Sequence, residues 1–299
     1  MRTIAVLLSS YNGSRYILEQ LDSLYSQKNV SIYIYVRDDS STDQTVEVLN
    51  ANNAGKFHLI KGNNLGWAKS FISLLCDVPD YDYYAFCDQD DVWLPDKLNV
   101  AINYLEKMGD SPNLYFSNLT YWKDGIEYGK VKPDNLYFDQ YTCLIQCPAY
   151  GCTMVFNNKL AQVIKKNPPK VVFAHDFWVF QTAMLLGHVV YDPKSYILYR
   201  QHANNQIGAK RSAKEIWGRR IKKSIPRLFT HHEAEDTAKE LLRCYDGYLR
   251  PEQKEIVQVV AYYRSSIRYY LTLLFSNKYV MSSRLNTFFL KCKILLCKL

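Results

Sequence analysis

Long apolar runs are missing from this sequence of 299 residues. No stretch of about 18 consecutive apolar residues occurs, so we do not expect a membrane-spanning helix. The apolar run at residues 3–9 is too short for a signal peptide, and no small-residue cleavage site follows it. We therefore expect a cytoplasmic protein. Its hydrophobic content of 48% is ample for a folded core, which excludes a disordered chain.

Several short motifs are missing as well. The eight cysteines include no CxxC pair and mostly lie in apolar patterns, so we expect reduced, buried thiols and no zinc site. No GxxxxGK(S/T) loop occurs, which excludes a P-loop NTPase, and no GxGxxG follows the first apolar strand, which disfavours a dinucleotide-dependent enzyme. A phosphorylated ligand would therefore need another source of positive charge.

Charge is divided unevenly along the chain. Residues 1–204 hold 18 Lys and Arg against 21 Asp and Glu, a balance of −3. Residues 205–299 hold 19 against 8, a balance of +11. The split indicates two segments with different electrostatic roles, and polar residues near 205–210 favour a boundary there. We predict a catalytic domain at 1–207 and a basic helical region at 208–299.

Strand and helix patterns alternate through the first two hundred residues. Strand patterns occur at residues 3–9, 31–39, 57–62, 81–91 and 113–122, and helical stripes fill the intervals between them. This alternation is typical of βαβ units and predicts an α/β fold with a doubly wound, mostly parallel sheet. Beyond residue 122 it weakens, with strands expected near 153–156 and 196–201 and a helix at 176–186. From about residue 210 only helices are expected.

Polar and acidic side chains follow three of these strands at their carboxyl ends. They are Ser9, Tyr11 and Asn12 after the first strand, Asp38, Asp39 and Asp43 after the second, and Asp88, Asp90 and Asp91 after the fourth. Ligands of open parallel sheets bind at this edge, so the clusters predict a site there. Capping of the adjacent turns and helices is the alternative role for these acids, and the one we favour for Asp38, Asp43 and Asp91.

An acidic pocket that takes a phosphorylated ligand needs a cation to reverse the local charge. Mg²⁺ or Mn²⁺ is commonly held by one or two carboxylates together with substrate phosphates. The sequence therefore predicts a nucleotide diphosphate group bridged to Asp90 by a divalent cation.

Six ordered segments carry a family resemblance: SSYNGSRYILEQLDSL, VRDDSSTDQT, NNLGWAKSF, FCDQDDVWLPDKL, AHDFW and YRQHANN. They resemble glycosyltransferase family 2, whose members have the GT-A fold, and are most similar to the bacterial rhamnosyltransferase-like branch that builds surface polysaccharides. The resemblance covers about residues 3–207. The QxxRW motif of processive members is missing, which disfavours a cellulose- or hyaluronan-type polymerase.

The resemblance implies how the donor is held. Ser9 and Tyr11 would line the nucleoside pocket, and Asp39 would accept a hydrogen bond from the pyrimidine imide. Lys69 would face the donor, although an exposed helix lysine is ordinary. Asp88 would contact the ribose or the metal.

The resemblance also implies the metal ligands and the base. Asp88-Gln89-Asp90 matches the DXD element, with Asp90 as the direct metal ligand. His202 would be a further metal ligand, as in some members, or else a structural histidine. Asp176 would be the catalytic base, although a helix-capping aspartate would have the same sequence context.

The reaction implied by the resemblance is a metal-dependent displacement that inverts the anomeric carbon. The expected donor is dTDP-L-rhamnose and the expected acceptor is a glycan on a polyprenyl lipid. Another hexose from a UDP- or dTDP-sugar is the nearest alternative. Two rivals from other classes are a sugar-1-phosphate nucleotidyltransferase and a non-catalytic glycan- or lipid-binding module.

The tail combines cations with apolar residues. Residues 256–299 contain no Asp or Glu and seven basic residues, namely Arg264, Arg268, Lys278, Arg284, Lys291, Lys293 and Lys298. A basic helix with an apolar face lies in the interface of anionic membranes. We therefore predict peripheral attachment to the inner face of the cell membrane. Packing on the catalytic domain or a homo-oligomer contact is the alternative, and nucleic acid is not expected because the acidic edge of the sheet would repel it.

Overall fold

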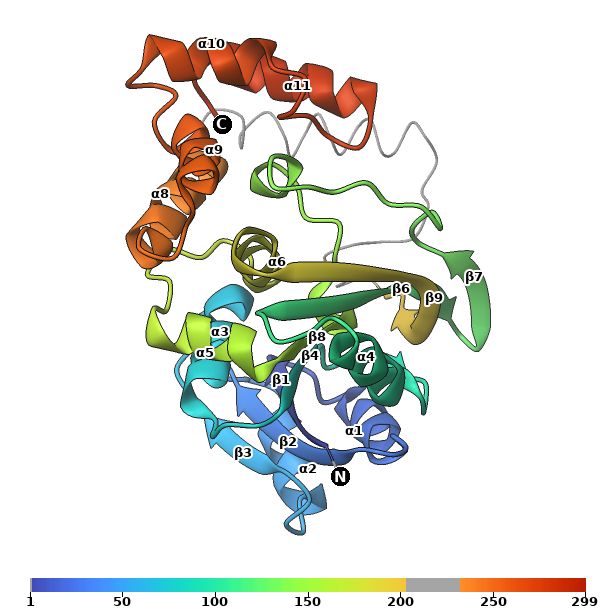
Figure 1. Cartoon of the computed structure of the whole chain (residues 1–299). Coiled ribbons are helices and arrows are strands. Elements are labelled where there is room, and N and C mark those ends of the chain that lie inside the picture. Colours follow the sequence, from blue (N-terminus) through green and yellow to red (C-terminus); the bar gives the residue numbers. More distant parts are fainter. Residues whose placement is uncertain (1, 203–231) are drawn as a thin grey trace. The chain divides into compact units, whose positions relative to one another are not determined.

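The computed structural model of the chain describes residues 2–202 and 232–299 (Figure 1). They form two compact units. The first comprises the chain up to Leu136 together with Pro148–Pro168 and Ala174–Arg200, and the second comprises Tyr137–Cys147, Pro169–Phe173 and the chain from Gln201 onward. The predicted boundary near 205–210 lies outside the described residues.

One half of the sheet is parallel. It contains β1 (Thr3–Ser10), β2 (Ser31–Asp38), β3 (His58–Lys61) and β4 (Tyr83–Cys87), with β1 paired to both β2 and β4. The connecting helices are α1 (Ile17–Tyr25), α2 (Thr45–Asn52), α3 (Trp67–Asp77) and α4 (Lys97–Glu106). Ile4 to Leu8 are fully buried, as expected for a parallel strand covered on both faces. The carboxyl ends of β1, β2 and β4 therefore meet at one edge.

The other half of the sheet is mixed. Its strands are β5 (Val92–Trp93), β6 (Asn113–Lys123), β7 (Ile126–Lys130), β8 (Met154–Asn157) and β9 (His188–Arg200), and the order is β3-β2-β1-β4-β8-β6-β9-β5 with β7 beside β6. The short β8 is antiparallel to both β4 and β6, whereas β6 and β9 run parallel. Helices α5 (Asn158–Lys166) and α6 (His175–Leu186) complete this unit.

Strand β9 is longer than its sequence pattern indicated. The expected strand covered only 196–201, but β9 begins at His188. Pro193 interrupts the apolar pattern, and the pairing with β6 shifts register between Asp192 and Ser195. A bulge accommodates a residue that cannot donate to the ladder, which is why the sequence pattern conceals the first half of β9.

Residues 232–299 of the second unit are helical, as expected. It contains α8 (Glu233–Tyr245), α9 (Pro251–Ala261), α10 (Ile267–Phe275) and α11 (Arg284–Leu295). Leu241, Tyr245, Val257 and Val260 are buried between α8 and α9. None of the helices within 2–202 and 232–299 is long and apolar enough to cross a membrane.

Candidate active site

The acidic turn after β4 is fastened to the loop after β1 by Gln89. Its Oε1 accepts hydrogen bonds from Ser10 Oγ and the Tyr11 amide, both at 2.9 Å, and its Nε2 donates to the Tyr11 carbonyl at 3.0 Å. A Cβ on Gly13 would lie 2.1 Å from Gln89 Oε1, so a larger residue there would displace the Gln89 side chain. In the sequence Gln89 is a spacer between two acids. The structure shows that it sets where those acids lie.

Two of the acids after β2 are turn and cap residues, as the sequence indicated. Asp38 accepts from the amide and hydroxyl of Ser41. Asp43 accepts from Ser14 Oγ at 2.7 Å and from the Thr45 amide at 3.0 Å. These bonds order the loop between β2 and α2 and leave the chemistry to other residues.

Asp39 is buried and largely engaged within the chain. It forms an ion pair with Arg37, and the amides of Leu65 and Gly66 each donate to its carboxylate at 2.9 Å. A carboxylate has about four acceptor positions, so about one remains for the imide of a base. The three bonds hold the loop before α3 in place. The predicted role of Asp39 toward the nucleoside stays a prediction.

The other predicted donor residues differ in accessibility. Ser9 Oγ lies 2.6 Å from Ser70 Oγ, which also accepts from Arg37 at 2.9 Å, so Ser9 belongs to a partly buried network. Tyr11 is 47% exposed. Lys69 is exposed on the first turns of α3. Tyr11 and Lys69 are therefore accessible to a ligand, whereas the hydroxyl of Ser9 is engaged with Ser70.

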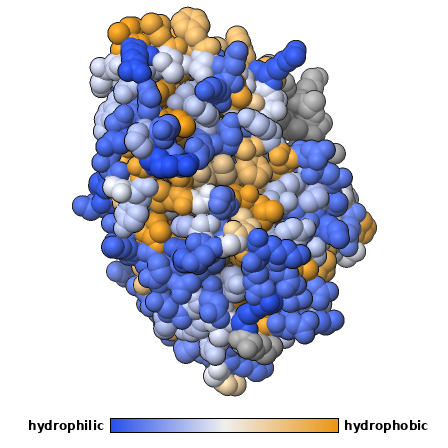
Figure 2. Space-filling view, viewed as in Figure 1, coloured by the Kyte–Doolittle hydropathy of each residue, from blue (hydrophilic) through white to orange (hydrophobic). Residues whose placement is uncertain are grey.

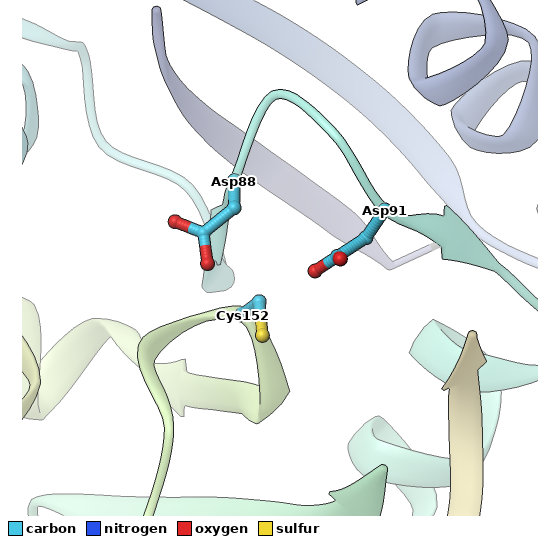
Figure 3. Close-up of side chains that lie close together, drawn as sticks. All are labelled: Asp88, Asp91 and Cys152. Atoms are coloured by element: carbon cyan, nitrogen blue, oxygen red, sulfur yellow. The ribbon is translucent and has the colours of Figure 1, made fainter. Parts of the chain in front are cut away.

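Asp88, Asp91 and Cys152 form a compact cluster at the same edge. Their ligand atoms lie within 4.8 Å of one another, and Figure 3 shows the two acids at either end of the turn with Cys152 below them in the view. Asp91 accepts from the Arg200 amide at 3.1 Å, and its Oδ2 is buried without a hydrogen-bond partner in the described chain. Our interpretation of Asp91 as a cap for the following turn is therefore wrong, because β9 supplies its donor.

The cluster accumulates more negative charge than a folded chain tolerates easily. Burial, with the charges of Asp90 and Asp176, raises the pKa of Asp88 to about 7. Burial, with the charges of Asp90 and Asp88, raises the pKa of Asp91 well above its usual range. A divalent cation would relieve this repulsion, and carboxylate oxygens are its preferred ligands. Burial and Asp91 also raise the pKa of Cys152, so the protonated thiol is a poor ligand.

A buried lysine lies behind the turn. Lys97 is 1% exposed, and its Nζ lies 3.4 Å from the centroid of the Trp93 ring. Burial lowers the pKa of Lys97 to about 8, opposed by the nearby Cys87, Cys152 and Asp91. Lys97 thus places a cation close to Asp91, a contact that no sequence pattern indicated.

Arg200 clamps the turn from the other side. Its Nε donates to the Asp90 carbonyl at 2.8 Å, and its Nη2 pairs with Glu19. The guanidinium lies 4.7 Å from the ring centroid of Tyr16 and 4.3 Å from that of Trp122. The turn that carries Asp90 is therefore held by the last residue of β9, a contact that no sequence pattern indicated.

Asp176 lies in the first turn of α6, near the cluster. Its Oδ1 accepts from the Phe177 amide at 2.8 Å, and Ala174 occupies the N-cap position. Burial raises the pKa of Asp176 to about 6, although hydrogen bonds from the amides of Phe177 and Gly151 and the charge of Lys132 oppose the rise. Asp176 is close enough to Asp88 to raise the pKa of that acid. The structure thus brings together two residues that are 88 positions apart in the sequence.

The histidine beside Asp176 is a packing residue. His175 is buried and stacks on Phe71 at 4.0 Å between ring centroids, with Trp67 and Phe86 edge-on. Burial lowers the pKa of His175 to about 3, so the ring is neutral. A Cβ on Gly151 would lie 2.3 Å from His175 Nε2, and the missing side chain lets the Gly151 amide reach Asp176.

The predicted metal ligand His202 belongs to the second unit. That His202 binds a metal ion together with Asp88 and Asp90 therefore stays a prediction. Trp93 and Trp178 are each 1% exposed and belong to the core.

The sequence of this chain is similar to those of known proteins. Residues 5–165 match the model of Glycosyl transferase family 2. The dTDP-rhamnosyl transferase RfbG of Shigella flexneri is 34% identical over 227 residues, which cover 71% of this chain and 77% of that protein. The chain belongs to glycosyl transferase family 2. This membership confirms the resemblance and makes the protein a glycosyltransferase, so the nucleotidyltransferase and binding-module rivals are set aside.

Two further known proteins are similar to this family 2 glycosyltransferase. The glucosyltransferase WfaP of Escherichia coli, named UDP-Glc:alpha-D-GlcNAc-diphosphoundecaprenol beta-1,3-glucosyltransferase, is 28% identical over 122 residues, 41% of this chain and 47% of that protein. The solved mannosyltransferase PcManGT of Pyrobaculum calidifontis, in complex with GDP-Man and Mn2+, superposes with a TM-score of 0.56 at 15% identity, covering 98% of this chain and 73% of that one. The predicted GT-A fold with its C-terminal helices is confirmed.

Proposed function

We propose that this glycosyltransferase transfers L-rhamnose from dTDP-L-rhamnose to a lipid-linked glycan during synthesis of a surface polysaccharide. The proposal depends on one observation: Asp176, whose pKa is raised, lies close to the acidic turn that carries Asp88. A base and a site for a charged leaving group are thereby brought together. The similarity to RfbG, named a dTDP-rhamnosyl transferase, supports rhamnose as the sugar.

Asp176 acts as the general base. A carboxylate with a pKa near 6 is ionised at neutral pH and is still basic enough to take a proton from an acceptor hydroxyl as the new bond forms. The Phe177 and Gly151 amides orient the carboxylate from the backbone side. Attack on the face opposite the leaving diphosphate inverts the anomeric carbon.

Asp88 and Asp90 are the residues that would hold Mn²⁺ or Mg²⁺, with His202 as a further ligand. Both acids are partly buried, whereas Asp91 is buried and already bonded to the Arg200 amide, so Asp88 and Asp90 suit an ion that must also contact substrate. A cation bound there would supply Lewis-acid stabilisation of the charge on the departing diphosphate. Gln89 and Arg200 keep the turn in a fixed position for this task.

The donor occupies the edge between β1 and β2. Asp39 offers its remaining acceptor position to the base, and the exposed Tyr11 and Lys69 contact the nucleoside and the diphosphate. The partial similarity to WfaP, whose name includes a diphosphoundecaprenol acceptor and a UDP-Glc donor, supports a lipid-linked acceptor. It also keeps transfer of another hexose from a UDP- or dTDP-sugar as the second candidate.

Turnover of a panel of nucleotide sugars tests the proposal. The purified chain is incubated with Mn²⁺ and dTDP-rhamnose, dTDP-glucose, UDP-glucose or UDP-N-acetylglucosamine, and release of the nucleoside diphosphate is followed with and without chelator. We expect release from dTDP-rhamnose to dominate and chelator to abolish it. Dominant release from a UDP-sugar would replace rhamnose with that sugar, and release that persists in chelator would reject the metal.

A further inference from the structure

Helix α10 turns an apolar stripe toward solvent. Ile267 is 73% exposed, Leu271 45% and Phe275 74%, and their spacing of four residues places them on one face of the helix. The fully buried Leu273 lies on another face. The apolar residues of α10 are therefore divided between the core of the second unit and solvent.

Helix α11 has the same arrangement. Its buried residues are Leu290 and Ile294, while an exposed apolar set runs along the helix and just past its end: Leu285, Phe288, Phe289, Leu295 and Leu296. Figure 2 shows hydrophobic residues gathered at the top of the view, where Figure 1 draws α10 and α11. We call these eight exposed residues on the two helices the apolar face.

Helices α10 and α11 are joined to each other by hydrogen bonds. Lys291 of α11 donates its Nζ to the carbonyls of Leu273 and Ser276 at 2.7 and 3.0 Å, which satisfies the C-terminal end of α10. Ser266 and Ser283 cap the starts of α10 and α11 with their side chains. The apolar face is therefore carried by ordered helices with satisfied ends, and soluble proteins rarely leave so many large apolar side chains together in water.

The charge around the apolar face indicates what covers it. Residues 256–299 hold seven Lys and Arg and no Asp or Glu. Arg264 and Arg268 pair with Glu235 and Glu255, and Lys291 binds carbonyls of α10. The cations with no carboxylate partner among the described residues are Lys278, Arg284, Lys293 and Lys298. A second copy of the chain would bring two such basic surfaces against each other, and their repulsion would weaken the contact. An anionic lipid surface attracts the cations and accepts the apolar side chains at once.

We propose that α10 and α11 dock this protein on an anionic membrane surface by inserting the apolar face among the lipids. Phe275 and Phe288, among the most exposed of the set, are the principal inserting side chains, and cations such as Lys278 and Arg284 contact the headgroups. The purpose of docking rests on the proposed function, since a lipid-linked acceptor lies in the membrane. Docking itself needs neither donor nor metal.

Co-sedimentation of the full chain with vesicles tests the docking surface. Vesicles of phosphatidylcholine with an equal part of phosphatidylglycerol are compared with phosphatidylcholine alone, without nucleotide sugar or metal. We expect binding to the anionic vesicles that weakens as salt rises. The double variant Phe275→Ser/Phe288→Ser should bind at least about tenfold more weakly, because each phenylalanine contributes its transfer energy.

Arg284→Glu tests the charge. Arg284 is the first residue of α11, where an acidic side chain favours the helix dipole, so the fold should be retained. At about 1 kcal/mol for each unit charge, a reversal of two charge units should weaken binding on the order of thirtyfold. Ile126→Ser, at an exposed aliphatic position on β7 of the first unit, is the matched control and should bind like wild type.

Each contrary outcome overturns the docking surface. Wild-type binding by folded Phe275→Ser/Phe288→Ser protein would place the contact elsewhere, and absence of wild-type binding to either vesicle would reject a lipid partner. A concentration-dependent dimer that the same double variant abolishes would make a second copy the occupant. Donor hydrolysis by the vesicle-binding variants is measured separately, so loss of docking and failure of the proposed reaction give different results.

Discussion

Replacing Asp176 with Asn should change activity and stability in opposite directions. The Asn side chain keeps an oxygen that can accept from the Phe177 amide, so the start of α6 is preserved. It cannot take a proton, and loss of a general base should lower turnover on the order of a hundredfold or more, with little change in donor affinity. The wild-type rate should itself fall about tenfold per pH unit below the pKa near 6, where the base becomes protonated.

The stability change follows from the pKa. The pKa of Asp176 is about 6 in the folded chain against 3.8 for an ordinary aspartate, so the folded state binds the proton more tightly than the unfolded one. Wild-type stability therefore falls as pH rises from about 4 to 6, by about 3 kcal/mol at most. Solvent reaches the side chain, so about 1–2 kcal/mol is the expected size. Asp176→Asn escapes this loss and should be more stable than wild type at pH 8 and equal to it near pH 3.

Urea unfolding at pH 4, 6 and 8, without metal, measures this difference. Asp43→Asn is the matched control in the same unit: burial opposes ionisation of Asp43, but hydrogen bonds from Thr45 and Ser14 outweigh it and lower the pKa. Asp43→Asn should therefore lose stability at pH 8. If Asp176→Asn loses stability at pH 8 along with donor binding, Asp176 is a structural cap and the base must be sought elsewhere.

Three further perturbations follow from the site. Asp90→Ala should abolish transfer and weaken Mn²⁺-dependent binding of the nucleoside diphosphate, and near-normal activity would remove the metal hypothesis. Arg200→Lys keeps the positive charge but cannot bind the Asp90 carbonyl and Glu19 at the same time. The Mn²⁺ concentration for half-maximal activity should therefore rise on the order of tenfold. Arg2→Lys, at a surface ion pair, is the control and should not change that concentration. Gly13→Ala should lower both donor affinity and melting temperature, because the added Cβ meets Gln89. Unchanged affinity and melting temperature would show that the turn adapts to the added Cβ. Gly247→Ala, with open space around it, is the control.

The sequence determined the features that depend on neighbouring residues. Continuous apolar runs specify β1, β2 and β4, because a strand buried on both faces has no polar side to alternate with. Parallel order then sends the carboxyl ends of all three to one edge, so the sequence alone predicts that the acids after β2 and β4 lie near one another. The turn and cap roles of Asp38 and Asp43 were predictable for the same reason, since their donors lie within about two to thirty residues along paired loops.

Only the tertiary structure decided which residues support those acids. The hydrogen bonds of Gln89 to Ser10 and Tyr11 span 79 and 78 positions, and Arg200 meets the Asp90 carbonyl across 110. Such contacts depend on strand order and register, which one sequence pattern does not encode. The segment just before the antiparallel β8 brings Cys152 to Asp88 and Asp91, and the end of β9 supplies the Arg200 amide that donates to Asp91.

The tail shows the same division. Its composition predicted basic, apolar helices, because charge and hydrophobicity are properties of the sequence itself. Which apolar side chains face water was settled by packing, since Leu273, Leu290 and Ile294 are buried while Ile267, Phe275 and their neighbours remain exposed. Helical periodicity gives a helix its faces, but the partners that it meets in the fold decide which face is left for solvent.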